Sequence, residues 1–228
     1  MAIVSEPRTS PEIAVLQVAI VIPAWNEAPT IERVVRSVMP GRTVIVVNDC
    51  SSDATAPIAA AAGAVVVNHT ANLGYDGALQ SGFEKAEELG MDIVVTFDAD
   101  GQHDAAILDE IIQPLARDQA DIVIGIRPQT ARFSEALFGL YTWLRYGVSD
   151  ILCGLKGYRI DLYKRRGHFD SYSSIGTELA LAALAGGARI AVVPVPVHER
   201  EDRPRFGQGL RANGRILKAM WRGLRIKA

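Results

Sequence analysis

The chain has 228 residues, of which 49% are hydrophobic, and its formal net charge is -2. This length and apolar content suit one α/β domain, so we expect a single domain. The small net charge excludes the broad basic field typical of nucleic-acid-binding proteins, although basic residues gather near the C-terminus. Cys50 and Cys153 are too few and too far apart for a metal cluster or a disulfide framework, which fits a reducing cytoplasm.

The sequence contains no uninterrupted apolar stretch of the roughly 18 residues that a membrane-spanning helix needs. The longest candidate, Phe133 to Val148, is interrupted by Ser134, Glu135 and Arg145. Residues 1–14 have neither the basic start nor the apolar run of a signal peptide and are predicted to form a loose arm. We therefore expect a cytoplasmic protein that does not cross the membrane by itself.

Short β-branched runs alternate with helical patterns through the first half of the chain. Strands are expected at Leu16–Ile22, Val44–Val47, Ala64–Val67, Ile93–Phe97 and Ile122–Ile126, and helices at Ala28–Val38, Asp53–Ala62, Leu73–Leu89 and Ala105–Ala116. Because parallel strands need crossover connections, this alternation predicts an α/β fold with a mostly parallel sheet flanked by helices on both faces. Ligands of such sheets bind beyond the carboxyl ends of the strands.

The second half has a less regular pattern. We expect an amphipathic helix at Phe133–Val148, a loop or strand at Asp150–Ile160, a helix at Gly176–Ala185, a strand at Arg189–Val197, a charged loop and a final helix. No repeat or linker divides the chain, so residues 15–208 are predicted to form one domain. Residues 209–228 form the last helix.

Polar side chains follow the first two predicted strands directly. The first strand runs into Pro23–Glu27 and the second into Asn48–Asp53, and these groups can hydrogen-bond the base and ribose of a nucleotide. A structural role is the alternative, because Asn26, Ser52 or Asp53 can simply cap the helix that follows.

The most informative segment follows the fourth predicted strand. Asp98 and Asp100 are two residues apart, so both carboxylates point the same way while the backbone stays extended. Their mutual repulsion is relieved by a divalent cation, and Mg²⁺ or Mn²⁺ is commonly held by one or two carboxylates and a substrate diphosphate. The alternative is a turn in which Asp104 caps the next helix, and His103 is expected to be solvated or hydrogen-bonded rather than a ligand.

Four segments in order, Pro23–Glu27, Asn48–Asp53, Asn72–Gly74 and Asp98–His103, resemble family 2 glycosyltransferases. The resemblance is strongest to the branch of dolichyl-phosphate mannose synthases and polyprenyl-phosphate glycosyltransferases, and it covers about residues 16–210. It implies a GT-A fold, inversion at the sugar carbon, and a nucleoside-diphosphate sugar bound with Mg²⁺ or Mn²⁺. It also implies a lipid-phosphate acceptor at the cytoplasmic face of a membrane, with a second copy or a membrane subunit left open as a partner.

The resemblance assigns roles to individual residues. It implies nucleotide contacts from Pro23, Ala24, Trp25, Glu27, Asn48, Asp49, Ser51, Asn72, Gly74 and Asp98, and metal contacts from Asp98, Asp100 and Gln102. It implies catalytic roles for Asp100, Asp150 and Arg127, and phosphate or acceptor contacts from Arg127, Lys156, Arg200, Arg203 and Arg205. Trp25 stands where the family often has tyrosine and Asn48 where it often has a second acid, so the base stays open between uracil and guanine.

The acceptor decides which residues the chemistry requires. An ionised lipid phosphate is itself a nucleophile, so positioning and charge neutralisation by arginines would suffice. A hydroxyl acceptor would need a proton acceptor, and Asp150 is then the candidate base. Two other classes remain open: a nucleotidyltransferase, although the glycine-rich phosphate loop of that class is missing after the first strand, and a non-catalytic sugar-nucleotide-binding subunit.

The last segment, Leu210 to Ala228, mixes apolar and basic residues. Helical spacing groups much of the apolar set on one side, which predicts a basic amphipathic helix that makes a peripheral membrane contact. An ordinary helix packed on the core is the alternative.

Overall fold

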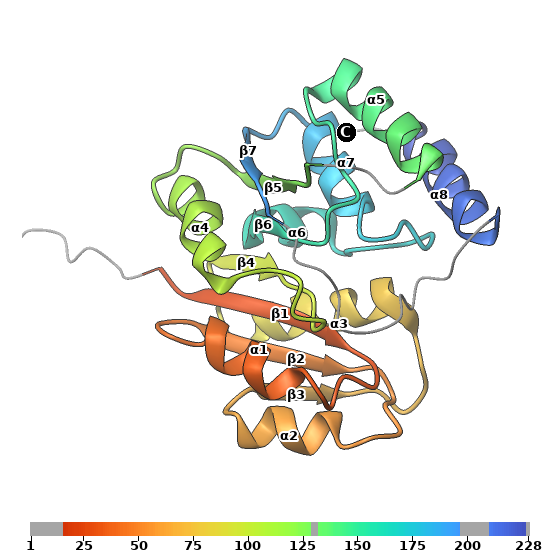
Figure 1. The fold of residues 1–228 in the computed structure, drawn as a ribbon. Coiled ribbons are helices and arrows are strands. Elements are labelled where there is room, and N and C mark those ends of the chain that lie inside the picture. Colours follow the sequence, from red (N-terminus) through yellow and green to blue (C-terminus); the bar gives the residue numbers. More distant parts are fainter. Residues whose placement is uncertain (1–15, 129–131, 197–209, 227–228) are drawn as a thin grey trace, which may run out of the picture.

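The computed structural model describes residues 16–128, 132–196 and 210–226. Its described strands are β1 (Val18–Ala24), β2 (Thr43–Asn48), β3 (Val65–Asn68), β4 (Ile93–Thr96), β5 (Ile122–Ile126), β6 (Lys156–Arg159) and β7 (Ile190–Pro194). They form one sheet in the order β3-β2-β1-β4-β6-β5-β7 (Figure 1). The arm predicted for residues 1–14 lies outside the described residues.

Helices cover both faces of this sheet. Their bounds are α1 (Ile31–Val38), α2 (Thr55–Ala61), α3 (Gly74–Glu88), the short 3₁₀ helix η1 (Ala105–Ile107), α4 (Leu108–Ala116), α5 (Phe133–Tyr146), α6 (Ile160–Arg166), α7 (Glu178–Ala185) and α8 (Leu210–Gly223). The predicted α/β class and the mostly parallel sheet are therefore confirmed.

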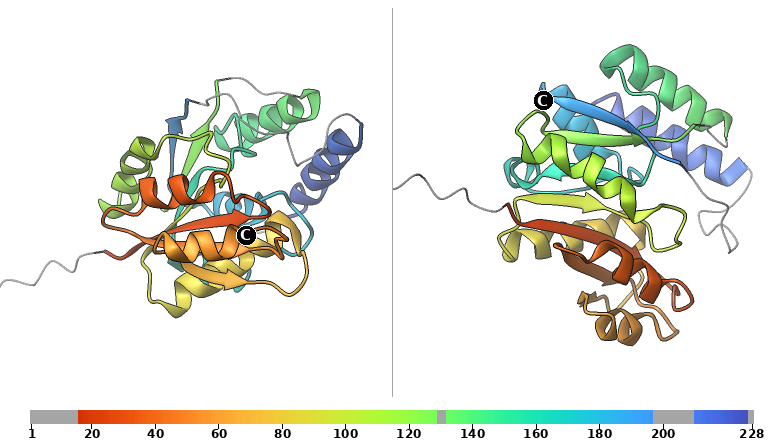
Figure 2. Two further views of the ribbon diagram at one scale, coloured as in Figure 1. Left: turned by 60° about the horizontal axis from the view of Figure 1, so that its bottom comes forward. Right: turned by 60° about the vertical axis from the view of Figure 1, so that its left-hand side comes forward.

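Alternation along β1 shows how the sheet separates two cores. Ala19 and Val21 belong to a cluster that includes buried residues of α3, α6 and α7, while Ile20 and Ile22 belong to one with α1, α2 and α4. Successive side chains of a strand point to opposite faces, so a run of apolar residues supplies both layers. Two views in Figure 2 show helices on either side of the sheet.

β6 is the exception to parallel pairing, since it runs antiparallel to both β4 and β5. The segment before it includes Leu152 and Gly154, which line a pocket at the carboxyl ends of the parallel strands. The chain thus enters β6 at the edge where its neighbours end, and it has to run in the opposite direction. The sequence left this segment as a loop or strand and did not predict α6. Within the described residues no helix is both long enough and apolar enough to cross a membrane.

Candidate active site

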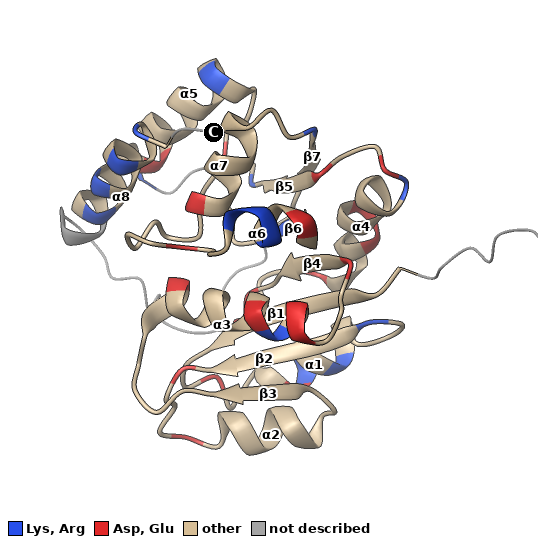
Figure 3. Ribbon diagram, turned by 180° about the vertical axis from the view of Figure 1, so that it is seen from behind, with Lys and Arg blue, Asp and Glu red and all other residues tan. Residues whose placement is uncertain are grey.

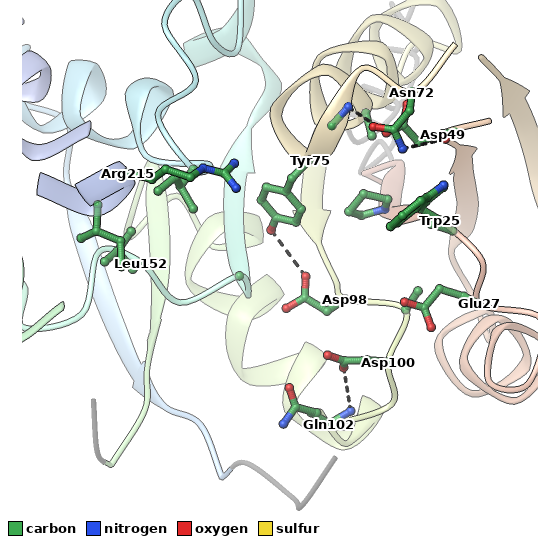
Figure 4. Close-up of a pocket in the computed structure, with 18 of the residues that line it drawn as sticks. Trp25, Glu27, Asp49, Asn72, Tyr75, Asp98, Asp100, Gln102, Leu152 and Arg215 are labelled. Carbon is green, nitrogen blue, oxygen red and sulfur yellow. Dashed lines mark hydrogen bonds between the residues drawn. The ribbon is translucent and has the colours of Figure 1, made fainter. Parts of the chain in front are cut away.

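A cavity of about 550 Å³ opens at the carboxyl ends of β1, β2, β4 and β5. Trp25, Glu27 and Asp49 lie on one side of it, Leu152 and Arg215 lie on the other, and Asp98 lies between them (Figure 4). The full lining comprises Pro23, Ala24, Trp25, Glu27, Asp49, Asn72, Gly74, Tyr75, Ala78, Asp98, Ala99, Asp100, Gln102, Arg127, Arg132, Glu135, Leu152, Gly154, Ile175, Arg215 and Ile216. Most of the predicted nucleotide and metal residues therefore share one cavity.

The loops after β1 and β2 are tied together by Asn26. Its backbone has a positive φ of 56°, a conformation that asparagine tolerates better than most residues. Its N–H donates to the Ser51 hydroxyl at 2.9 Å, and its side-chain oxygen accepts from the N–H of Ser52 at 2.8 Å. Ser51 is thus a support for the wall and does not line the cavity, and the same holds for Asn48, whose amide donates to Asn68.

Asp49 is a buried carboxylate whose hydrogen bonds come from three directions. Oδ1 accepts from the N–H of Leu73 at 2.7 Å, and it lies 2.7 Å from Nδ1 of His69. Oδ2 accepts from the N–H of Gly74 at 2.8 Å. Because a carboxylate has no hydrogen to give, the His69 nitrogen must be the donor. These contacts fix one edge of the carboxylate against the start of α3.

The acidic segment after β4 lies in the middle of the cavity, where Asp98, Asp100 and Gln102 all line the wall. Asp98 Oδ1 accepts from the Tyr75 hydroxyl at 3.4 Å, and Asp100 Oδ1 accepts from the N–H of Gln102 at 3.0 Å. Burial, and then the charge of Asp98, raise the pKa of Tyr75 well above its ordinary value. Tyr75 therefore stays protonated and can keep donating to Asp98.

These oxygen donors fit a hard divalent cation. In the described part of the chain, no cluster of three or more His, Cys, Asp or Glu side chains could hold a metal by itself. A cation bound here would take its other ligands from water and substrate phosphates, as Mg²⁺ usually does. His103 was expected to be solvated or hydrogen-bonded, and its ring is in fact buried edge-on against Phe97, with Nε2 3.9 Å from Asp98 Oδ2.

Arg127 forms a buried ion pair at the opposite wall. Its Nε donates to Asp150 Oδ2 at 2.7 Å and one terminal nitrogen donates to Oδ1 at 2.9 Å, which is a bidentate contact. Burial alone would lower the pKa of Arg127, but the hydrogen bonds to Asp150 outweigh it and raise the pKa. Glu135 lies 3.5 Å from Arg127 and also accepts from Arg132. The wall thus presents two arginines that are held in place by two acids.

Two expectations for the acceptor side change in the structure, and a third falls on residues that the structure does not describe. Asp150 is only 3% exposed and does not line the cavity, so it lies behind Arg127 and not where a base for an acceptor hydroxyl would be. Lys156 is also buried, and its ammonium donates to the carbonyls of Cys153 at 2.6 Å and Gly176 at 3.1 Å. It does not line the cavity and is not placed for a phosphate contact. Arg200, Arg203 and Arg205 lie outside the described residues.

Several lining residues were not among the predicted ones. Tyr75 follows the predicted Gly74 motif, but its contact with Asp98 depends on how α3 packs. Arg132 and Glu135 come from the start of α5, and Arg215 comes from α8. No short motif marks residues on helices that reach the site through tertiary packing.

Comparisons with known proteins agree with this geometry. The family model described as Glycosyl transferase family 2 matches residues 19–165. An undecaprenyl-phosphate mannosyltransferase of Micrococcus luteus is 28% identical, covering 93% of this chain and 99% of its own. A UDP-N-acetylglucosamine–dolichyl-phosphate N-acetylglucosaminyltransferase of Methanococcus voltae is 31% identical, covering 61% of this chain and 68% of its own.

Solved structures share the fold at low sequence identity. Glucosyl-3-phosphoglycerate synthase from Mycobacterium tuberculosis, in complex with Mn²⁺, UDP and glucosyl-3-phosphoglycerate, superposes with a TM-score of 0.74 at 22% identity. The match covers 94% of this chain and 82% of that one.

Proposed function

This chain belongs to glycosyl transferase family 2, and we propose that it moves a sugar from a uridine-diphosphate sugar to a lipid phosphate, with inversion and with a divalent cation. The observation that carries the proposal is the order of groups across one cavity. The carboxylate of Asp49 lies on one side, the oxygens of the segment Asp98–Gln102 lie in the middle, and arginines beside apolar residues lie on the other side. A nucleotide, a diphosphate and an acceptor phosphate would occupy these three parts in turn.

The hydrogen bonds of Asp49 favour uracil as the base. Oδ1 already meets two donors and Oδ2 meets one, so among the described residues one acceptor position of the carboxylate is left. Uracil offers a single ring N–H donor. Guanine offers two neighbouring N–H donors, which would need both carboxylate oxygens of Asp49. Similar solved structures are complexes with UDP and with UDP-glucose, which supports the same choice.

Asp98, Asp100 and Gln102 are the residues that would hold the cation. When bound, Mg²⁺ or Mn²⁺ stabilises the negative charge that develops on the departing nucleoside diphosphate. The chain itself keeps Asp98 in place through Tyr75 and orients Asp100 through the N–H of Gln102. Structural neighbours in complex with Mn²⁺ or Mg²⁺ and UDP support this assignment.

The wall opposite the nucleotide side suits a phosphate joined to an apolar chain. Arg127, Arg132 and Arg215 lie there together with Leu152 and Ile216. Guanidinium groups can hold phosphate oxygens through paired hydrogen bonds. The names of two relatives give undecaprenyl phosphate and dolichyl phosphate as the molecules that receive the sugar. We place the activity at the cytoplasmic face of a membrane, where such acceptors would be met.

A lipid phosphate also agrees with the position of Asp150. The phosphate oxygen of the lipid is ionised at neutral pH and attacks without losing a proton to the protein. The reaction therefore needs orientation and charge neutralisation more than a base. Arg127, held by Asp150, would draw the acceptor phosphate toward the sugar although both substrates are negatively charged. A small phosphorylated hydroxyl acceptor is the second candidate, because a similar solved structure, that of glucosyl-3-phosphoglycerate synthase, is a complex with phosphoglyceric acid.

Calorimetric titration tests the donor half of the proposal. UDP-sugars and GDP-sugars are titrated with and without Mn²⁺ into the protein, into Asp100→Ala, and into Asp104→Asn as a matched control. Asp104 caps η1 and does not line the cavity. We expect Mn²⁺-dependent binding of a UDP-sugar that Asp100→Ala loses and Asp104→Asn keeps. Binding of GDP-sugars alone would overturn the choice of base, and metal-independent binding would overturn the assigned cation.

Transfer assays then test the acceptor half. The bound donor is offered a polyprenyl phosphate in detergent, and in a parallel reaction phosphoglyceric acid. Sugar transfer to the polyprenyl phosphate is the expected result. Transfer to phosphoglyceric acid alone would replace the lipid acceptor with the second candidate.

A further inference from the structure

The outward side of α5 is apolar even though its inward side already packs on the core. Phe138, Gly139 and Thr142 face inward and are buried. Phe133, Leu137, Leu140 and Leu144 follow one another at intervals of four, three and four residues, which places them on one side of a helix. That side is open, with Phe133 80% and Leu144 71% exposed. A helix that is apolar all round is normally covered by protein or lipid.

α8 carries a second exposed apolar stripe that is separate from its core side. Ile216 and Ala219 are buried, and a methyl group at Gly223 would come 2.7 Å from Leu181 of α7. Leu217, Trp221 and Leu224 are spaced four and three residues apart and are exposed. The predicted basic amphipathic helix is therefore divided into three sides, which are a core side, an apolar outer side and a basic side.

The two helices lie next to each other, so their stripes form one surface. The Ser134 hydroxyl of α5 is 2.5 Å from the Asn213 side-chain oxygen of α8. All views of Figures 1 and 2 place α5 and α8 together at one end of the molecule. Seven of the twelve large exposed hydrophobic side chains in the described residues belong to these helices, and an eighth, Leu224, directly follows α8. We call this set the α5/α8 surface: Phe133, Leu137, Leu140, Trp143, Leu144, Leu217, Trp221 and Leu224.

Among the described residues of α5, α8 and the turn after α8, the exposed charges have one sign. Arg145, Lys218 and Arg225 are exposed on or just after α5 and α8, and Glu135, the only acid within these two helices, is buried. Figure 3 shows the basic residues along α8 and at the far end of α5. The Arg225 guanidinium lies 3.7 Å from the centre of the Trp221 ring, so a cation and an exposed indole are already paired.

We infer that the α5/α8 surface docks onto an anionic lipid bilayer, with both helices lying in the plane of the membrane surface. Tryptophans and leucines would enter the boundary between headgroups and acyl chains, while the cations beside them meet anionic headgroups. A second copy fits less well, because a twofold contact would place the same basic residues of each chain against one another.

Docking through this surface would bring the cavity to the membrane. Arg132 and Glu135, at the start of α5, and Arg215 and Ile216, on α8, line the cavity and adjoin the α5/α8 surface in the chain. An acceptor phosphate in the headgroup layer would therefore face Arg132 and Arg215. The inference rests on the proposed function for the identity of that acceptor, but the bilayer contact itself does not depend on it.

Sedimentation of the full chain with lipid vesicles tests the contact. One variant carries Leu140→Gln, Trp143→Gln and Leu144→Gln, and a second carries Leu217→Gln and Trp221→Gln. The matched control carries Leu89→Gln and Val192→Gln, two exposed apolar residues outside the surface. We expect binding to phosphatidylglycerol vesicles but not to phosphatidylcholine vesicles, with a loss of about tenfold or more in each surface variant and none in the control.

Other outcomes would overturn the inference. Unchanged vesicle binding in both surface variants would remove the surface from the membrane contact. Absence of vesicle binding by the unsubstituted chain would also reject the membrane contact. A dimer on gel filtration that dissociates in the surface variants would assign the surface to a second copy. Circular dichroism of each variant confirms that it is folded.

Sugar transfer to a short, water-soluble isoprenyl phosphate separates this inference from the proposed function. Normal transfer by the surface variants, together with lost vesicle binding, is the expected result. Normal vesicle binding by the unsubstituted chain, with no transfer to any lipid phosphate, would reject the proposed acceptor but not the membrane contact.

Discussion

The backbone of Gly154 lies against the carboxylate of Asp98, so that a methyl group at position 154 would come 2.4 Å from Oδ2. Gly154 is itself fixed, because its carbonyl accepts from the Thr96 hydroxyl at 2.6 Å. The carboxylate of Asp98 therefore fits at this point of the cavity only because Gly154 has no side chain. A larger residue would have to push aside the side chain of Asp98, which we propose as a metal ligand.

Gly154→Ala should therefore weaken metal-dependent donor binding without unfolding the protein. We expect a loss of about a hundredfold in kcat/KM, since a shift of about 1 Å in a reacting group has effects of that size. Titration of Mn²⁺ in the presence of UDP, together with steady-state kinetics, measures it. Gly214→Ala is the matched control because a methyl group there meets nothing within 4 Å. Equal metal affinity in both variants would show that Asp98 does not need this space.

The bidentate pair between Arg127 and Asp150 gives a second prediction. Asp150→Asn keeps the shape but removes the charge that holds the guanidinium, so Arg127 should be less well oriented. We expect turnover to fall about 10–100-fold and the free energy of unfolding to fall by about 1–3 kcal/mol. The fall in turnover should be the same across pH 6–9, because Asp150 positions Arg127 and does not take a proton.

The pH profile separates the two roles of Asp150. Loss of an acidic limb from the profile of Asp150→Asn would restore the assignment of this residue as a base. Asp118→Asn is the control, since Asp118 also pairs with an arginine, Arg189, but on the open surface. Exposed ion pairs contribute little to stability, so this control should behave like the unsubstituted protein.

The half of the site made by strand ends could be predicted from the sequence. Pro23, Asp49 and Asp98 each follow a β-branched run, and parallel strands bring their carboxyl ends to one edge of the sheet. The motif therefore fixes both the residue type and its place in space. The strand β5 was predicted with its observed bounds for the same reason, because Ile122–Ile126 is a continuous apolar run.

The half of the site that depends on packing could not be predicted. Arg215 is one of several similar basic residues of α8, and only the packing of that helix selects it for the cavity. Lys156 shows the opposite case, because a lysine in a glycine-rich segment looks exposed but is enclosed by the carbonyls of Cys153 and Gly176. The apolar character of the exposed side of α5 was not predicted either, because the amphipathic helix expected at Phe133–Val148 would have turned polar residues outward.

His69 links the carboxylate of Asp49, which we propose as the base-binding group, to Ser81 of α3. Nδ1 donates to Asp49, so in the neutral ring Nε2 is the acceptor for the Ser81 hydroxyl at 2.9 Å. His69→Phe should let Asp49 turn away from the base. We expect the donor KM to rise about 5–30-fold, the equivalent of one lost buried hydrogen bond or two, with kcat changed less than twofold.

Ser81→Ala is the control for this prediction, because it removes only the partner of Nε2 and leaves the contact with Asp49. Its donor KM should rise by less than that of His69→Phe. A fall in kcat at unchanged KM in His69→Phe would instead place His69 in the chemical step.

Asp76 makes the stability of the protein depend on pH. It lies in the first turn of α3 and accepts from the N–H groups of Ile175 at 3.1 Å and Gly176 at 2.5 Å. Burial, and then the nearby charge of Asp170, raise its pKa from 3.8 to about 6. Between these two pH values the folded chain binds a proton at Asp76 that the unfolded chain does not bind. The resulting stabilisation is full below pH 3.8 and is lost as the pH rises through 6.

Urea unfolding at pH 4–7 measures this effect when the protein is compared with Asp76→Asn. The free energy of unfolding of the unsubstituted protein, relative to that of the variant, should fall by up to about 3 kcal/mol over this range. Asp161→Asn, an exposed acid in the first turn of α6, should instead run parallel to the unsubstituted protein. A constant difference between protein and Asp76→Asn would mean that Asp76 titrates alike in both states. The hydrogen bond from the N–H of Ile175 to Asp76 would then be equally strong at every pH in this range.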